Sequence, residues 1–334
     1  MATSGTVGAT TVDAAALIEE AFRQCGKLPS TVSAELLDSA RLVLYRYLSS
    51  LVTRGLSLWC VEKQVIGTAA FQAWYPLRRG TSDVLEVLYR LKTDFTGSTI
   101  SGTGWQGIDA GEDVKVDVAS IQFSTASAVA LKVSSSADQV TWTDRATFYV
   151  QPTATTAWQC CDVENSAEAR YWRVATVDGT ALPTVAQLTF SSVDNETNMS
   201  KLNRDDYVNL PNKTFSVPGG TNVLQFWYDK QIEPRIWCWP QSQGDTDQIV
   251  VWGQRLIQDV GALTNTLEVP SRWLEAITLG LSSRVVLSVP PNEVPPGRIE
   301  LLKERYDEAL VQAEDGENDG SPIRLQPNIM GYTA

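Results

Sequence analysis

The side chains that could carry chemistry in this chain are carboxylates, thiols and tryptophans, because its 334 residues include no histidine. Without an imidazole, Ser-His-Asp and Cys-His catalysis, His-ligated zinc and histidine-based pH switching are all excluded. Carboxylate or lysine chemistry remains open. Cleaving a glycosidic bond, for example, takes two carboxyl groups at a defined separation, one protonated and one ionised.

No motif selects such a pair from the 39 acidic residues. Glu19 and Glu20 have the spacing of an exposed helix surface. The acids between 314 and 319 lie in a polar segment that reads as a solvated linker. No Gly-x-Gly-x-x-Gly, Walker or metal-ligand spacing is present either. We therefore expect a protein that is not an enzyme and that uses no cofactor and no metal.

The thiols point the same way. The five cysteines are Cys25, Cys60, Cys160, Cys161 and Cys238. An odd number without a Cys-x-x-Cys spacing is not a disulfide framework. We expect buried free thiols in a protein assembled in a reducing cytoplasm.

Tryptophan is the remaining candidate for ligand contact. Four of the 11 tryptophans, Trp105, Trp142, Trp158 and Trp172, lie between residues 94 and 196, where their ring faces could contact a ligand. The alternative is that most of these four, Trp172 among them, fill a core, which is the commonest use of aromatic residues.

Net charge is −12. Residues 94–196 hold 13 acidic and 5 basic side chains, which gives −8 and leaves −4 for the rest. Such a chain does not bind nucleic acid by neutralising phosphates, but it could surround DNA without adhering to it. No apolar run approaches the roughly 20 residues of a membrane helix. Residues 1–11 lack the features of a secretory signal.

Helical periodicity marks both ends of the chain. Thr11 is expected to cap a helix starting at Val12, and a second helix over 34–54 forms a hairpin with it. A central helix is predicted after Pro270 and ends before Pro290. Its buried stripe is Trp273, Leu274, Ile277, Leu281, Val285 and Leu287. A last helix over 296–313 places Ile299, Leu302, Tyr306, Ala309 and Leu310 on one face.

Between these helices the period changes to that of strands. Strand-like runs occur at 59–91 and 223–252, and a short helix is expected near Tyr207. Residues 95–196 are dense in Gly, Ser and Thr and contain strand-like runs at 114–118, 129–133, 146–150, 169–174 and 187–190. Short strands at regular spacing predict an all-β sandwich. The fold class is α+β: a core of residues 1–93 and 197–313 with an inserted sandwich at 94–196.

The C-terminal segment, residues 314–334, reads as an acidic linker followed by an extended apolar arm. The arm has two prolines and no period, so we expect it to dock on a partner subunit. The alternative is an arm folded across its own domain. The docking residues would be Ser321, Pro322, Ile323, Arg324, Leu325, Pro327, Ile329, Met330 and Tyr332.

The segments flanking the insertion resemble the head-to-tail adaptor, or tail accessory factor, of short-tailed bacteriophages. The matching stretches are 15–22 (AALIEEAF), 36–40 (LLDSA), 55–59 (GLSLW), 204–213 (RDDYVNLPNK), 254–261 (QRLIQDVG), 269–276 (VPSRWLEA) and 321–325 (SPIRL). This resemblance implies a mostly helical protein that forms a dodecameric ring below the portal protein. Its C-terminal arm would reach onto the portal, close the packaged head and seat tail nozzle or tail fibre proteins. The implied location is the head-tail junction of a virion assembled in the host cytoplasm.

The insertion resembles discoidin-like (galactose-binding-like) sandwiches. The resemblance rests on Trp105 with 108–111 (IDAG), on 133–142 (VSSSADQVTW) and on 168–174 (EARYWRV). The chain departs from extracellular members in having no cysteine pair around the domain, and 137–139 lacks their Asp-Gly turn. The resemblance implies carbohydrate binding as one possibility, with Trp105, Trp142 and Trp158 as the candidate glycan contacts, since indole rings can stack on sugar rings. Three hypotheses follow: a connector ring, a peptidoglycan-hydrolysing tail protein, and a carbohydrate-binding virion module acting through the sandwich.

Overall fold

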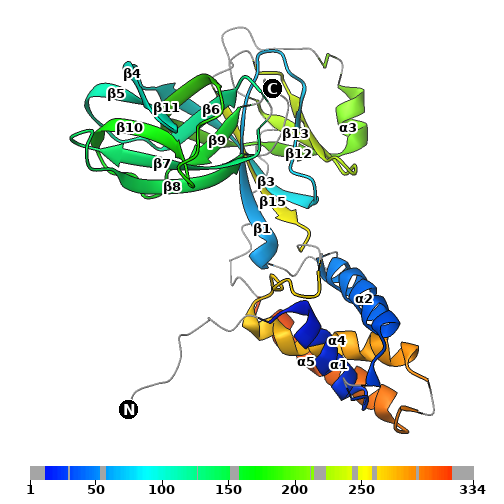
Figure 1. Cartoon of the computed structure of the whole chain (residues 1–334). Coiled ribbons are helices and arrows are strands. Elements are labelled where there is room, and N and C mark those ends of the chain that lie inside the picture. The colour runs from blue at the N-terminus through cyan, green and yellow to red at the C-terminus, as the bar shows by residue number, and fades with distance from the viewer. Residues whose placement is uncertain are drawn as a thin grey trace. The chain divides into compact units, whose positions relative to one another are not determined.

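The computed structural model describes residues 12–28, 31–52, 58–125, 127–150, 158–210, 212–213, 223–242, 247–257, 262–290 and 293–317. The chain divides into two compact units. A helical unit combines Met1–Cys60 with Leu256–Ala334, and a β unit comprises Val61–Arg255 (Figure 1). The predicted α+β class is confirmed.

The helical unit contains α1 (Ala14–Gln24), α2 (Ala34–Val52), α4 (Leu274–Val285) and α5 (Arg298–Asp315), with short 3-10 turns at Leu58–Cys60, Ser271–Trp273 and Val286–Ser288. Asp13 caps α1, because its Oδ1 accepts the Ala16 N–H at 2.7 Å. The predicted cap, Thr11, lies outside the described residues. Helix α4 packs against α1, α2 and α5, which makes it the central helix, as predicted.

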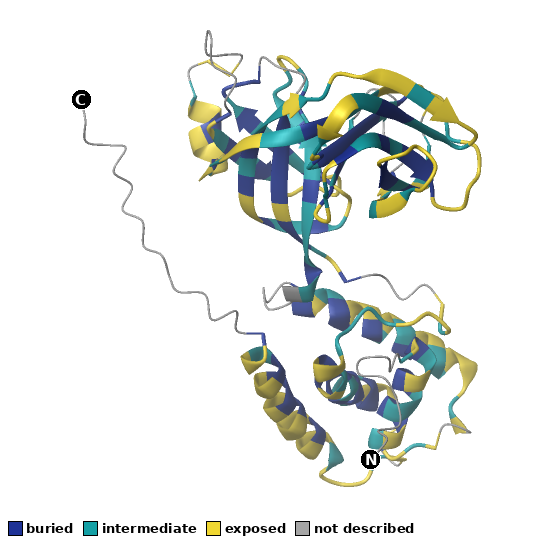
Figure 2. Cartoon of the chain, turned by 90° about the vertical axis from the view of Figure 1, so that its left-hand side faces the viewer, coloured by how far each residue is buried: buried dark blue, intermediate teal, exposed yellow. Residues whose placement is uncertain are grey.

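The core of the helical unit is apolar. On α1, Ala14, Leu17, Ile18, Ala21 and Phe22 are all buried. Trp273, Ile277, Leu281 and Val285 are buried in the predicted α4 stripe, whereas Leu287 is 74% exposed because the chain has left α4 for a 3-10 turn. Ile299, at the start of α5, is also exposed. Figure 2 shows buried residues on the inner faces of the helices and strands and exposed residues outside.

The β unit contains three sheets. A closed barrel runs in the order β1 (Val61–Gly67), β15 (Gln248–Arg255), β3 (Thr81–Asp94), β11 (Val185–Asn198), β6 (Val118–Phe123) and β9 (Gln159–Asp162). A five-stranded sheet runs β4 (Ser98–Gly102), β5 (Trp105–Val114), β10 (Ala169–Thr176), β7 (Val129–Ser136) and β8 (Thr143–Val150). A small sheet runs β12 (Ser200–Leu202), β13 (Gln225–Asp229), β14 (Arg235–Trp239) and β2 (Trp74–Pro76), with α3 (Arg204–Asn209) beside it.

The predicted β-sandwich is confirmed between residues 95 and 198. The five-stranded sheet faces barrel strands β6 and β11 across a core that includes Ile121, Leu131, Val133, Trp172, Val174 and Phe190. A second core joins barrel strands β3 and β15 to the small sheet through Val87, Tyr89, Ile249, Val251, Phe226 and Ile236. Residues 114–118 are not a strand, since β5 ends at Val114 and β6 begins at Val118.

The predicted boundaries at 93 and 197 differ from the observed division. Residues 61–93 and 197–255 group with the sandwich, because β3 pairs with β11 from Ser191↔Asp94 to Asn198↔Leu88 and β1 pairs with β15 along its whole length. Hydrogen bonding within one sheet therefore joins segments that the change of composition near residue 94 had separated.

The predicted acidic linker starts too early. Residues 314 and 315 continue α5 to Asp315, and Glu317 is only 5% exposed. Its carboxylate accepts hydrogen bonds from the Arg272 guanidinium and, at 2.9 Å, from the Trp273 indole N–H. This part of the segment is therefore packed, because two donors compensate the burial of the charge.

Candidate binding groove

The β unit has a groove of about 600 Å³. Strand β1, strand β2 with the loop to β3, the β8–β9 edge and the start of β14 all contribute to its walls. Its aromatic lining is Trp74, Tyr75, Phe148, Tyr149 and Trp158, and its charged lining is Arg78, Arg79, Arg235 and Glu233. Ligand sites commonly combine such an apolar lining with a few polar groups that fix orientation.

Trp158 is held in this groove by a close approach to β1. A Cβ on Gly67 would lie 2.6 Å from the Cβ of Trp158, a distance that real structures do not tolerate. Only glycine at position 67 lets the tryptophan pack there. The half-buried Trp158 and the 53% exposed Tyr149 place aromatic surface in the groove.

Another part of the groove lining pairs the Trp74 ring with an arginine. The Arg235 guanidinium lies 4.3 Å from the centroid of the Trp74 ring, within the range of a cation–π contact. Strand β14 pairs with β2 at Arg235↔Pro76 and Trp237↔Trp74, which brings these residues together. Arg78 is engaged differently, by Glu62 at 3.5 Å.

Trp105 and Trp142 lie elsewhere, next to each other on the five-stranded sheet and the turn that follows β7. Their ring centroids are 5.6 Å apart, and the Arg173 guanidinium is 4.0 Å from the Trp142 ring and 5.4 Å from the Trp105 ring. Burial lowers the pKa of Arg173, against the nearby charge of Asp144. The two rings are thus already in contact with an internal partner.

The structure therefore brings Trp105 and Trp142 together and places Trp158 in a different site. Trp172, the fourth tryptophan of the segment, is fully buried, and its N–H donates to the Ala169 carbonyl at 2.9 Å. The groove partners of Trp158, namely Trp74, Tyr149 and Arg235, were not singled out from the sequence. The sequence feature that could have pointed to Trp74 and Arg235 is the pair of aromatic-rich runs at 71–75 and 235–239.

A charge network joins the barrel strands β1, β3, β9 and β11. Arg90 donates to Asp162 at 2.6 Å and to Glu196 at 2.7 Å, and Lys63 also pairs with Asp162. Burial by itself would raise the pKa of Asp162, but hydrogen bonds and charge from Arg90 and Lys63 outweigh it and hold that pKa below its ordinary value. The arrangement is a compensated ion-pair network and leaves Asp162 ionised.

Six carboxyl groups of the β unit have a pKa that lies below its ordinary value. The pKa is lowered at Asp83, Asp109, Asp138, Asp144, Asp162 and Asp178. A glycosidase acid needs the opposite, a carboxyl kept protonated near neutral pH. None of these six carboxyl groups therefore has the raised pKa of a glycosidase acid.

The thiols match the prediction of buried free cysteines. All five are free, and Cys25, Cys60, Cys161 and Cys238 are buried. Burial raises the pKa of Cys25 to about 11 and that of Cys161 to about 12, so these thiols are poor nucleophiles at neutral pH. Within the described ranges, no group of three or more Cys, Asp or Glu side chains could hold a metal ion.

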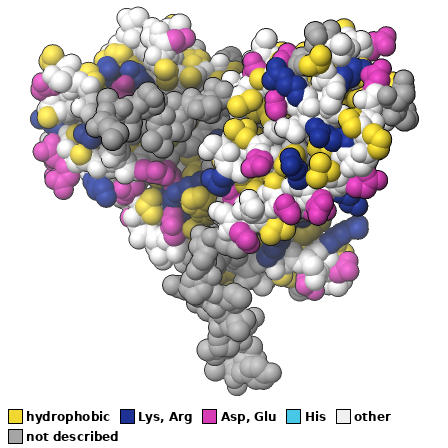
Figure 3. Space-filling view, turned by 90° about the horizontal axis from the view of Figure 1, so that it is seen from below, with side chains coloured by type: hydrophobic (Ala, Val, Ile, Leu, Met, Phe, Trp, Pro, Cys, Tyr) yellow, Lys and Arg dark blue, Asp and Glu magenta, His cyan; other side chains and the backbone are white. Residues whose placement is uncertain are grey.

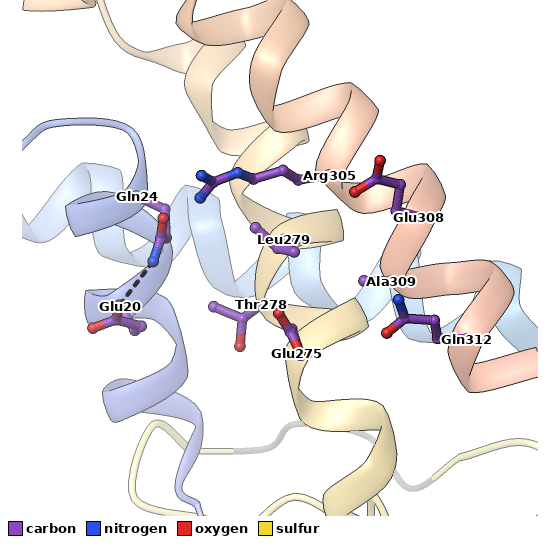
Figure 4. A pocket seen from close by; sticks show the side chains of 9 residues that line it. All are labelled: Glu20, Gln24, Glu275, Thr278, Leu279, Arg305, Glu308, Ala309 and Gln312. Carbon is purple, nitrogen blue, oxygen red and sulfur yellow. Dashed lines mark hydrogen bonds between the residues drawn. The ribbon is translucent and has the colours of Figure 1, made fainter. Parts of the chain in front are cut away.

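The helical unit has a smaller hollow of about 360 Å³ between α1, α4 and α5. Its walls are mostly polar, and in Figure 4 the Arg305 side chain points from α5 toward α1, where Gln24 donates to Glu20 at 3.1 Å. Glu275 and Glu308 complete an acidic rim. The predicted docking arm, Ser321 to Tyr332, lies outside the described residues. No helix in the described part of the chain has the length and hydropathy to cross a membrane.

No family model and no curated protein matches this sequence. Solved structures similar to part of the chain include carbohydrate-binding modules and glycoside hydrolases. A CBM32 domain from a family 31 glycoside hydrolase of Clostridium perfringens is 16% identical over 30% of this chain and 76% of its own, with a TM-score of 0.22.

The CBM32 of AlyQ in complex with 4,5-unsaturated mannuronic acid is 11% identical over 33% of this chain and 96% of its own, with a TM-score of 0.23. A chitosan-binding module from a chitosanase/glucanase of Paenibacillus sp. IK-5 is 17% identical over 42% and 96%, with a TM-score of 0.19. At these scores the likeness identifies neither a ligand nor a binding site in this chain.

Proposed function

We propose that this protein is a head-to-tail connector of a bacteriophage virion, which forms a homo-oligomeric ring under the portal protein. The supporting observation is that the resembling segments 15–22, 36–40 and 269–276 lie in one helical unit with apolar side chains on its outer surface, whereas the segment that starts at Arg204 lies in the β unit. Leu42 and Tyr45, three residues apart on α2, are 51% and 41% exposed. Neighbouring copies in a ring would cover them.

The charge of the helical unit suits passage of DNA without binding. Glu300, Glu304, Asp307, Glu308 and Asp315 are exposed along α5. On the face drawn in Figure 3, acidic and basic side chains are interspersed with hydrophobic ones, so this face is not a basic surface of the kind that holds phosphates. In the proposed ring, the connector encloses the DNA, closes the head and seats tail nozzle or fibre proteins.

The test is assembly with the portal. We expect the protein mixed with its portal to form rings in negative-stain images, with stoichiometry measured by light scattering. Leu42→Glu should abolish rings while leaving a folded chain, and Gln312→Glu, at an exposed polar position on α5, should leave the rings intact. If the double variant Leu42→Glu with Tyr45→Glu still forms rings, α2 is not part of the interface.

The arm is tested by truncation. Ending the chain after Ala313 would also remove Glu317, the partner of Arg272 and Trp273, and would confuse docking with folding. Ending it after Glu317 keeps this contact. We expect that variant to remain folded and to lose portal attachment, and retained attachment would argue against the docking arm.

A second candidate function is carbohydrate binding by the β unit, and the groove beside Trp158 is the observation that favours it. Glycan-array binding by the whole chain tests it, with Trp158→Ala and Tyr149→Ala as variants. The segment 94–196 alone is a poor test, because β11 pairs with β3 and β9 pairs with β1 outside it. If the protein bound no glycan on the array, this function would be refuted.

A further inference from the structure

The groove beside Trp158 carries positive charge although the protein as a whole is acidic. Three arginines, Arg78, Arg79 and Arg235, and one acid, Glu233, line it, whereas the chain has a net charge of −12. Arg78 is engaged by Glu62. Arg79 and Arg235 make no ion pair with any residue that the structure describes. Two guanidinium groups are therefore available to a ligand.

Arg235 is also held in a fixed position. Its guanidinium rests on the Trp74 ring at 4.3 Å, and its backbone is paired with Pro76 on one side and Asp229 on the other. A guanidinium stacked on an aromatic face keeps its N–H groups free at the edge of the plane. Those groups fit the two oxygens of a carboxylate.

Aromatic surface lies in the same groove. Trp158, fixed against Gly67, and the exposed Tyr149 offer ring faces on which the C–H surface of a pyranose can stack. The groove volume of about 600 Å³ is in the range of sites for small ligands. A ligand that satisfies both features needs apolar ring faces and a negative charge.

We propose that this groove binds an acidic saccharide of the uronic acid type, with Arg79 and Arg235 contacting its carboxylates and Trp158 and Tyr149 stacking on its rings. The proposal rests on the second candidate function, carbohydrate binding by the β unit, and adds the class of sugar. Trp105 and Trp142 have no part in it, because Arg173 already lies against both rings.

The experiment compares acidic sugars with their neutral counterparts. Tetramers of glucuronate, galacturonate and mannuronate, and the carboxyl-reduced form of each, are titrated into the whole protein by calorimetry. We expect at least one tetramer to bind about tenfold or more tightly than its reduced form, because each charge-assisted hydrogen bond lost costs roughly that factor. Arg79→Ala with Arg235→Ala should remove the preference.

Controls separate the two levels of the proposal. Arg204→Ala removes an exposed arginine on α3, outside the groove, and should leave affinity unchanged. Tyr149→Ala, at an exposed position, should lower the affinity for acidic and reduced sugars alike. Trp158→Ala should lower both affinities more strongly, and its unfolding curve shows whether the variant is folded. Equal affinity for acidic and reduced tetramers would overturn the charge selection alone. Binding of neither would overturn both the selection and the carbohydrate function.

Discussion

The helical unit and the β unit use polar side chains in opposite ways. Among the described residues, the buried polar side chains of the helical unit are Ser282 and Glu317, whereas the β unit buries Arg90, Asp247, Gln248 and many others. All the carboxyl groups with a lowered pKa also belong to the β unit. The helical unit therefore rests on apolar packing, and the β unit also on specific polar partners.

This difference fits two separate tasks. An apolar helical body with Leu42 and Tyr45 left outside is suited to association with copies of itself. A polar network costs stability when any partner is missing, but it fixes strands in one arrangement. Of the groove residues, Tyr149 and Arg235 lie on strands, and Arg79 and Trp158 lie in the loops beside them. Each test below asks whether the two units differ as this comparison requires.

The largest expected effect comes from two matched core tryptophans, Trp172 in the β unit and Trp273 in the helical unit, both buried. Replacing either with alanine should lower the free energy of unfolding by about 3–5 kcal/mol, measured in urea. Hydrogen exchange should then show loosened amides within 61–255 for Trp172→Ala and in the helices for Trp273→Ala. Loosening of the same amides by both variants would mean that the two units unfold as one.

The next effect is electrostatic. Asp162→Asn leaves the buried Arg90 with Glu196 as its remaining acidic partner, so we expect a loss of about 2–3 kcal/mol at pH 7. A carboxyl whose pKa is lowered by folding stabilises the protein above its unfolded pKa of about 3.9. That contribution disappears as the pH falls through the lower folded value.

The β unit should therefore lose stability below about pH 4, and the helical unit should lose less. The pKa of Asp138 falls to about 2, because the Thr141 and Val140 N–H groups donate to its carboxylate, and this sets the lower end of the window. Urea unfolding at several pH values measures how the free energy of unfolding changes with pH, and Asp162→Asn serves as the reference. An equal acid loss in both units would contradict the comparison.

A smaller effect probes apolar packing in the helical unit. A Cβ on Gly280 would lie 2.2 Å from the Tyr47 hydroxyl and 2.8 Å from Tyr306, so Gly280→Ala should destabilise by about 1–2 kcal/mol despite the better helix propensity of alanine. Gly316→Ala is the control, since its new Cβ would meet nothing closer than 3.4 Å. A stabilised Gly280→Ala variant would show that α2 and α5 can move apart from α4.

The sequence predicted these helices well, because each has a local apolar stripe, as Leu17, Ile18 and Phe22 illustrate. It predicted β7, β8, β10 and β11 in the same way. The barrel could not be predicted, since the pairing of Arg90 with Gln248 joins residues that no local pattern connects. For the same reason Trp158 was named and its groove partner Arg235 was not. Glu317 was assigned to a solvated linker because its burial depends on Arg272 and Trp273, far away in the chain.

The smallest effect concerns the turn where the chain departs from the discoidin-like pattern. Gln139 has φ of 63°, a left-handed conformation that glycine adopts at little cost and other residues adopt with strain. Its N–H donates to Ser136 Oγ and its carbonyl accepts from the Trp142 indole, both through the backbone. Gln139→Gly should keep these bonds and stabilise the protein by about 0.5–1 kcal/mol, a balance of relieved strain against added chain entropy.

Gln139→Ala is the matched control for this turn, because it removes the same side chain beyond Cβ but keeps the Cβ that causes the strain. It should not stabilise. If alanine gave the same gain as glycine, the cost would lie in the glutamine side chain and not in the backbone. The result also bears on the comparison of the two units. Both non-glycine residues with positive φ in the described chain, Phe71 and Gln139, belong to the β unit. Backbone strain of this kind persists only where surrounding contacts such as hydrogen bonds hold the residue in place. The β unit is the part of the molecule that relies on such polar partners.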